Sequence, residues 1–133
     1  MNIDAINTRL KKNKLPELAG EDYCGMQSPL VMHLRERGKL AYLGIKNHKG
    51  EYTILGENLV YVSAEDKECE IPINVFVAAL SGIAMQLGKG TDVEYIFIAN
   101  WGNVWMKNNF TMTALWNTAL LFNSSPPDLG GTQ

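Results

Sequence analysis

The pattern of apolar and polar positions predicts two helices at the start of the chain. In residues 3–13, Ile3, Ile6 and Leu10 recur at helical spacing on one face, which is typical of an amphipathic helix. Residues 15–27 contain two glycines and no sustained period, so we expect an irregular connection there. A second helix is expected over residues 28–37, because Ser28 is a favourable N-cap and Pro29 suits a first helical turn.

Strand patterns follow. Residues 40–46, 51–55 and 59–63 are mainly apolar, and short segments containing Gly50 and Gly56 separate them. Short turns between consecutive strands favour an antiparallel meander. The acidic run at residues 65–70 is expected to be a solvated connection, with docking of a basic partner as its alternative role.

The segment 71–107 is expected to supply most of the core. Residues 73–87 predict a helix that is apolar around most of its circumference, and Gly82 inside it suggests a closely approaching element. Residues 93–99 and 103–107 predict two strands joined by a turn at 100–102. From Met112 to residue 123 the apolar spacing predicts a last helix.

These elements predict one α+β domain over residues 1–123 and a disordered tail over residues 124–133. The expected order is α-α-β-β-β-α-β-β-α, with an about five-stranded, mostly antiparallel sheet and helices packed against it. After the first helices this order is similar to that of small bacterial secretion-chaperone dimers. The likeness concerns element order alone, and no sequence signature accompanies it, so it does not settle function.

Composition narrows the function classes. Hydrophobic residues make up 46% of the 133, which is enough for a core without disulfides or metal. The 12 basic and 14 acidic residues give a net charge of -2, so we expect no nucleic-acid partner. The first residues lack the apolar run of a signal peptide, and no stretch has the length of a membrane span, which predicts a cytoplasmic protein without membrane contact.

The sequence shows no recognisable pattern of catalytic, metal-binding or cofactor-binding residues. Cys24 and Cys69 are expected to be free thiols, and no metal or cofactor pattern is present in the sequence. The Gly-Lys-Gly segment at 88–90 closes a helix rather than opening one, which excludes a phosphate loop of the usual kind. An enzyme would need Cys24 beside His33, or Glu94 beside a second carboxylate.

An aromatic turn is the one unusual local composition. Asn100, Trp101, Asn103, Trp105 and Asn108 combine flat apolar area with polar groups, so we predict a binding surface there. The opposing interpretation is that Trp101 and Trp105 share one strand face and fill the core under the last helix.

The sequence therefore predicts a non-catalytic cytosolic domain that binds and masks a protein partner, of the immunity, inhibitor or secretion-chaperone kind. The alternative is a small-ligand-binding protein with an aromatic-lined pocket between sheet and helices, gated by Trp101 and Trp105. An enzyme of unknown class is third. Because the central helix offers more apolar surface than one sheet covers, a homodimer is also expected.

Overall fold

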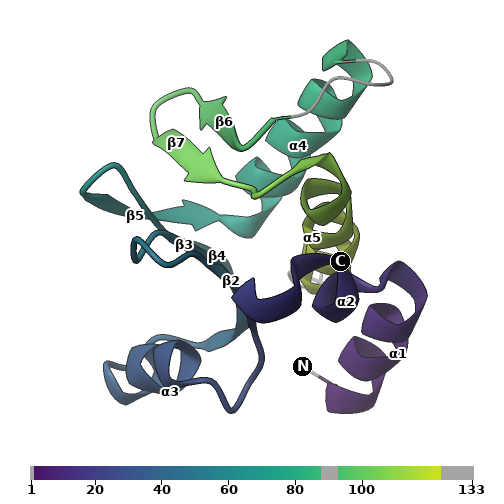
Figure 1. Ribbon diagram of the computed structural model, residues 1–133, viewed down its shortest axis with the longest axis vertical. Helices are drawn as coiled ribbons and strands as arrows, with labels where there is room; N and C mark the ends of the chain where they lie inside the picture. Colours follow the sequence, from purple (N-terminus) through teal and green to yellow (C-terminus); the bar gives the residue numbers. More distant parts are fainter. Residues whose placement is uncertain (1, 88–92, 124–133) are drawn as a thin grey trace, which may run out of the picture.

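The computed structural model describes residues 2–87 and 93–123 (Figure 1). The expected disordered tail at 124–133 and the Gly-Lys-Gly segment at 88–90 lie outside these ranges. The helices are α1 (Ile3–Asn13), α2 (Leu15–Ala19), the 3-10 helix η1 (Gly20–Asp22), α3 (Pro29–Glu36), α4 (Ile73–Leu87) and α5 (Asn109–Asn123). The strands are β1 (Tyr23–Cys24), β2 (Ala41–Lys46), β3 (Tyr52–Gly56), β4 (Leu59–Ala64), β5 (Lys67–Pro72), β6 (Tyr95–Ile98) and β7 (Gly102–Trp105).

The predicted α+β class and the five-stranded antiparallel sheet are confirmed. The sheet has the order β1-β2-β3-β4-β5, and β2, β3 and β4 form the expected meander. Their register places Thr53 opposite Ile45 on one side and opposite Val62 on the other. Short connections permit this neighbouring antiparallel arrangement.

The acidic run is a strand, which corrects the expectation of a solvated connection. Residues 67–72 form β5, the edge strand beside β4. Glu65 and Asp66 have positive φ angles of 53° and 64° and make the two-residue turn before it. Ile71 and Cys69 face the core, while Glu68 and Glu70 alternate outwards. Charged side chains are common on edge strands because they discourage pairing with other chains.

The segment expected to be an irregular connection also contains regular structure. Residues 15–24 form α2, η1 and the short strand β1, which pairs with β2 at the other edge of the sheet. Leu15 and Ala19 are buried, and they fix α2 against the rest of the molecule. A five-residue helix is too short to show a clear period in sequence.

The β6–β7 hairpin forms a two-stranded sheet of its own instead of extending the main sheet (Figure 1). β7 contacts β3 and β4, two interior strands whose backbone groups are already paired on both sides. The hairpin therefore stacks on the face of the sheet. The Thr53 hydroxyl donates a 2.6 Å hydrogen bond to the Trp105 carbonyl at this contact.

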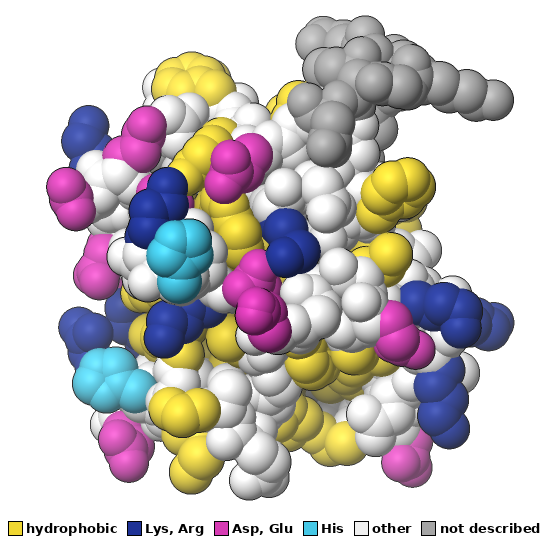
Figure 2. Space-filling view, in the orientation of Figure 1, with side chains coloured by type: hydrophobic (Ala, Val, Ile, Leu, Met, Phe, Trp, Pro, Cys, Tyr) yellow, Lys and Arg dark blue, Asp and Glu magenta, His cyan; other side chains and the backbone are white. Residues whose placement is uncertain are grey.

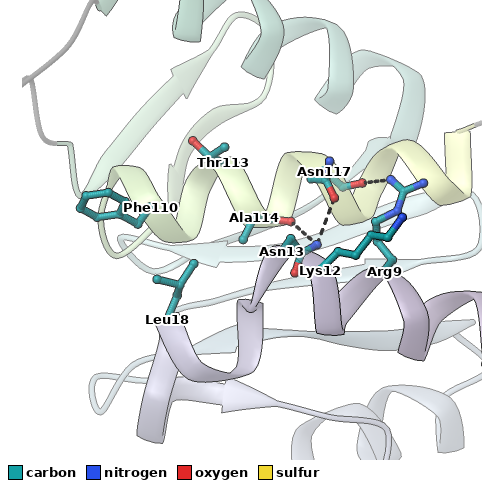
Figure 3. Close-up of a pocket in the computed structure, with 8 residues that line it drawn as sticks. All are labelled: Arg9, Lys12, Asn13, Leu18, Phe110, Thr113, Ala114 and Asn117. Atoms are coloured by element: carbon teal, nitrogen blue, oxygen red, sulfur yellow. Dashed lines mark hydrogen bonds between the residues drawn. The ribbon is translucent and has the colours of Figure 1, made fainter.

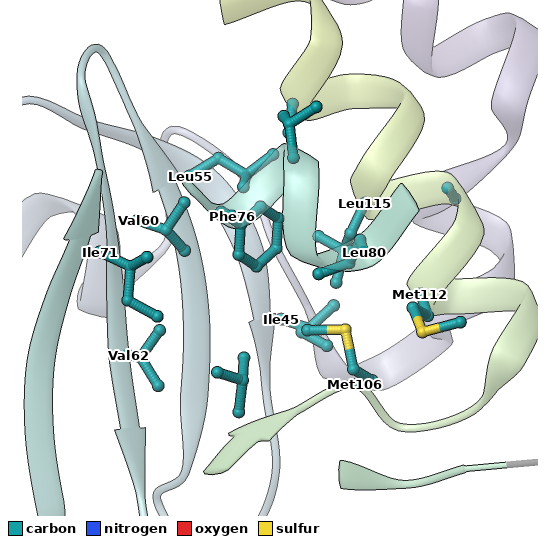
Figure 4. Packing of buried hydrophobic residues seen from close by; sticks show 14 of the residues in the cluster. Ile45, Leu55, Val60, Val62, Ile71, Phe76, Leu80, Met106, Met112 and Leu115 are labelled. Atoms are coloured by element: carbon teal, nitrogen blue, oxygen red, sulfur yellow. The ribbon is translucent and has the colours of Figure 1, made fainter. Parts of the chain in front are cut away.

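The two faces of the main sheet carry cores of different size. The larger core lies between the sheet, α4, α5 and the hairpin, and Phe76 and Leu80 of α4 pack there against Leu115 of α5 (Figure 4). The smaller core lies on the opposite face, where Val31 and Leu34 of α3 cover the sheet. α3, the sheet, and the layer of α4, α5 and hairpin thus form three layers.

Gly82 does not mark a close approach, contrary to the expectation. It is exposed on α4, and a Cβ placed on it meets no described atom within 4 Å. Asn74 and Ala78 are exposed on the same helix, whereas Phe76 and Leu80 are buried. The described part of α4 is therefore covered on one side by its own chain.

Candidate functional site

The structure separates the two tryptophans of the predicted aromatic turn. Trp101 lies in the turn between β6 and β7 and is 36% exposed, whereas Trp105 at the end of β7 is only 3% exposed. Asn100 adopts a positive φ of 75° and Gly102 one of 112°, so the chain between the two is no unbroken strand. Trp105 joins the core, as the opposing interpretation expects of it, and Trp101 stays at the surface.

The three asparagines of the predicted binding surface do not all lie at the turn. Asn103 donates a 2.6 Å hydrogen bond to Glu65 Oε1 and lies beside Trp101, and Asn100 is exposed in the same turn. Asn108 instead accepts a hydrogen bond from the Thr111 N–H and caps the first turn of α5. The structure thus brings Asn100, Trp101 and Asn103 together, and it places Trp105 and Asn108 in structural positions.

Phe97 also belongs to this surface, whereas the sequence analysis assigned its strand to the core. It is 68% exposed and stands opposite Asn103 in the hairpin register. The signal for it was available, because Ile96 and Ile98 alternate with it and both are buried. A strand with one face on the core must direct the intervening residue outwards.

A small cavity lies between the hairpin and the β4–β5 turn. Its volume is about 130 Å³, and we name it and its lining the aromatic notch. Figure 2 shows apolar side chains at the hairpin end of the molecule with acidic side chains close by. The residues that line the aromatic notch are Ala64, Glu65, Lys67, Cys69, Phe97, Trp101, Gly102 and Asn103.

The hairpin is held over the sheet by a cluster of hydrogen bonds centred on Glu51. Glu51 Oε1 accepts from the Tyr95 hydroxyl at 2.5 Å and from Asn47 Nδ2 at 2.8 Å, while Oε2 accepts from the Glu65 N–H at 3.0 Å. Burial raises the pKa of Glu51, but these hydrogen bonds and Lys49 outweigh it and leave the pKa below its ordinary value. The hydrogen bond to Glu51, followed by burial, raises the pKa of Tyr95 to about 12, so its hydroxyl remains a donor.

This cluster predicts a pH dependence of stability. A carboxyl whose pKa is lower in the folded state stabilises the fold above its unfolded pKa, and that stabilisation is lost as the pH falls through the folded value. Glu51→Gln is expected to lower the free energy of unfolding at neutral pH by about 1–3 kcal/mol. The difference from the wild type should shrink below about pH 4. Urea unfolding from pH 3 to pH 7 measures the loss of stability at neutral pH and its decrease at low pH. The exposed Glu36→Gln is the control. Equal stability of Glu51→Gln and wild type at neutral pH would contradict the role of the cluster.

A larger hollow lies on another part of the molecule, between α1, α2 and α5 (Figure 3). Its volume is about 610 Å³, and we name it the α1–α5 groove. Phe110 and Leu18 lie at one end, and Arg9 and Lys12 lie at the other. The residues that line the α1–α5 groove are Arg9, Lys12, Asn13, Leu18, Phe110, Thr113, Ala114 and Asn117.

Hydrogen bonds fix the floor of this groove. Arg9 Nη1 donates to the Asn117 carbonyl at 2.7 Å, and Asn13 Nδ2 donates to Asn117 Oδ1 at 3.2 Å and to Thr118 Oγ1 at 2.8 Å. These bonds join α1 to α5 across more than 100 residues of sequence. The sequence interpretation missed the groove because its residues come together only when the first and last helices pack.

Cys24 and Glu94, two of the residues considered for catalysis, each make a hydrogen bond to another described residue. The Cys24 thiol lies near the Asp22 carbonyl, and burial raises its pKa, which favours the neutral thiol. His33 is exposed on α3, and no hydrogen bond between described residues joins it to Cys24. Glu94 accepts a hydrogen bond from Trp105 Nε1 at 3.1 Å, a structural contact.

Buried side chains from both layers pack together where the described helices meet the sheet. Between the sheet and the helices, Phe76, Leu80 and Leu115 are each at most 1% exposed (Figure 4). Trp105 belongs to the same buried cluster. The hollows described above lie instead at the surface. Within residues 2–87 and 93–123, no helix has the length and apolar character to cross a membrane. Comparison of the chain with protein-family models, with curated proteins and with solved structures finds no match.

Proposed function

We propose that this protein is a non-catalytic domain that binds and masks a partner protein through the aromatic notch. One observation carries the proposal: Phe97 and Trp101, both exposed, line a cavity of about 130 Å³ on a rigidly held hairpin. Engineered apolar cavities of roughly 150 Å³ hold a benzene molecule, so this volume suits one apolar side chain. Protein interfaces concentrate their binding energy in such anchors, where aromatic residues surround a pocket.

The charge around the aromatic notch favours a basic partner. Glu65, Asp66 and Glu68 lie in or beside the β4–β5 turn, and Lys67 is the one cation among these four consecutive residues. Asp66 and Glu68 are exposed. A partner with lysine or arginine next to its apolar anchor would complement this surface and associate faster at low ionic strength.

The rigidity of the hairpin supports the same function. Tyr95, Asn103 and Trp105 each make a hydrogen bond to the main sheet or its turns, through Glu51, Glu65 and Thr53 respectively. A surface that is already ordered loses little conformational entropy when a partner binds. An inhibitor, immunity protein or secretion chaperone of the cytoplasm would use the aromatic notch to cover a surface of its partner.

A displayed peptide library tests this proposal without a known partner. The intact domain is expected to enrich peptides with one bulky apolar residue flanked by lysine or arginine. For the enriched peptides, Trp101→Ala and Phe97→Ala are each expected to raise Kd by about 30-fold, the effect of a hot-spot residue. Met32→Ala, which removes an exposed apolar side chain on α3, is the matched control and should leave Kd within about twofold.

Two outcomes would contradict the proposal. Enrichment of no peptide class would do so, and so would peptides that bind Trp101→Ala as tightly as the wild type. A homodimer remains a separate expectation, which light scattering at micromolar concentration checks. A dimer that dissociates on Trp101→Ala would make a second copy the occupant of the aromatic notch.

A further inference from the structure

We propose that the α1–α5 groove is a second protein-binding site, which takes a polyproline-type segment with an apolar residue and, three positions later, an acidic one. This inference goes beyond the function proposed for the aromatic notch and does not depend on it. It rests on the distribution of apolar, polar and cationic side chains along the groove (Figure 3).

The apolar end offers an anchor. Phe110 is 73% exposed, more than the other large apolar side chains of the described residues, and Leu18 beside it is 38% exposed. Phe110 is the second residue of α5, at a helical position turned away from the buried Met112. An aromatic ring and a leucine at one end of a cleft are the kind of surface that receives an apolar side chain.

The opposite end is cationic. The eight described residues that line the groove include Arg9 and Lys12 but no carboxylate. Arg9 donates through Nη1 to the Asn117 carbonyl, which orients the guanidinium and leaves further N–H donors for a ligand. Lys12 is exposed, and no described residue forms an ion pair with it. A carboxylate at this end would gain charge-assisted hydrogen bonds.

The middle of the groove suits an extended backbone. Thr113 and Asn117 lie one helical turn apart on α5 and line the groove between its two ends. Their hydroxyl and amide groups offer hydrogen bonds to peptide groups. An extended segment has unpaired N–H and C=O groups that can use them, whereas a bound helix has already paired its own.

The spacing follows from helix geometry. Asn117, whose carbonyl accepts the hydrogen bond from Arg9, lies seven positions after Phe110. Seven positions along a helix correspond to a rise of about 10 Å. A polyproline-type segment rises about 3.1 Å per residue with three residues per turn. Residues three positions apart therefore lie on the same face, about 9 Å from each other. In a β-strand the side chains three apart would point to opposite faces.

A protein ligand is favoured over a nucleic acid. Arg9 and Lys12 alone would suit phosphates, but half of the groove is apolar and the chain carries a net charge of -2. Nucleic-acid sites usually extend over a larger basic surface. Nucleic-acid binding is therefore a competing outcome that the experiment must detect.

Fluorescence anisotropy with synthetic peptides tests the inference. The probe is a labelled peptide with blocked ends, in which a leucine and a glutamate enclose two prolines in an alanine–proline background. Saturable binding is expected. It should weaken at least tenfold when the glutamate becomes glutamine, and also when one proline is removed so that the charge moves to another face.

Protein variants locate the site. Phe110→Ser and Lys12→Gln are each expected to raise Kd at least fivefold. Lys11→Gln is the matched control, because Lys11 is an exposed neighbour of Lys12 that does not line the groove, and it should leave Kd within twofold. Trp101→Ala should also leave Kd unchanged, which separates this site from the aromatic notch. Circular dichroism confirms that each variant is folded.

Several results would overturn the inference. Absence of saturation at millimolar peptide would do so, as would equal binding of the glutamate and glutamine peptides. A single-stranded oligonucleotide that binds more tightly than the peptide and is lost in Lys12→Gln would reassign the groove to nucleic acid. Self-association that disappears in Phe110→Ser would reassign it to a second copy of the chain.

Discussion

Gly44→Ala is expected to lower the free energy of unfolding by about 3 kcal/mol or more, a large fraction of the total stability of a single domain. Gly44 lies in β2, between Cys24 of β1 and Ile54 of β3. A Cβ on it would fall 2.0 Å from the Thr53 carbonyl oxygen and 2.7 Å from the Ile54 Cα. Both atoms belong to the backbone of an interior strand, which cannot move without breaking its pairing on either side. Circular dichroism during urea unfolding measures the effect.

Gly82→Ala is the matched control for this prediction. Gly82 lies on α4, where an added Cβ meets no described atom within 4 Å. Alanine is the better helix former, so this variant should be more stable than the wild type by roughly 0.5–1 kcal/mol. A Gly44→Ala protein as stable as the wild type would show that β2 and β3 do not approach as closely as described.

Trp105→Ala is expected to lower the free energy of unfolding by about 3–5 kcal/mol. Trp105 belongs to the main core, and its indole N–H donates to Glu94 at 3.1 Å. The substitution leaves a large cavity between the hairpin and the sheet and removes that hydrogen bond. Chemical unfolding measures the loss, and the emission of the remaining tryptophans reports whether the hairpin stays folded.

Trp101→Ala should differ clearly from Trp105→Ala. Trp101 is partly exposed in the turn, so its removal is expected to cost less than about 1 kcal/mol of stability. The same substitution carries the large effect on peptide binding predicted for the aromatic notch. Similar destabilisation by both variants would mean that both tryptophans are core residues, and it would remove Trp101 from the candidate interface.

Local features of the fold were predictable because the interactions that make them lie within a few residues. Ser28 Oγ accepts from the Val31 N–H, and Pro29 begins α3, as expected from capping chemistry. Gly38 with φ of 84° follows that helix. The meander likewise follows from strand patterns separated by short turns containing glycine.

The acidic run was wrongly predicted because its charge was considered without its alternation. Cys69 and Ile71 face the core from β5, and the charges between them point outwards. The two-residue turn at Glu65 and Asp66 contains no glycine, so it lacks the usual signal of a tight hairpin. Burial of Ile71 and pairing with β4 outweigh the weak local preference for a loop.

The candidate sites likewise include one part that is local in the sequence and one that only tertiary packing creates. The aromatic turn was found from sequence through Trp101 and its asparagines, since these are neighbours along the chain. Phe97 could have been included from alternation with Ile96 and Ile98. The groove could not have been found, because Arg9 and Phe110 come to line one hollow only through the packing of α1 on α5.

The sequence alone determined the α+β class, the meander, the capped helix α3 and the segment that supplies much of the core. Backbone preferences, side-chain periodicity and turn chemistry act over a few residues, so they can be recognised from neighbouring positions in the sequence. Only the tertiary structure decided that the hairpin stacks on the sheet, that Trp105 is buried while Trp101 is exposed, and that α1 and α5 enclose a groove. These outcomes depend on which surfaces, distant in sequence, bury the most apolar area when they pack together. Local sequence patterns do not indicate this.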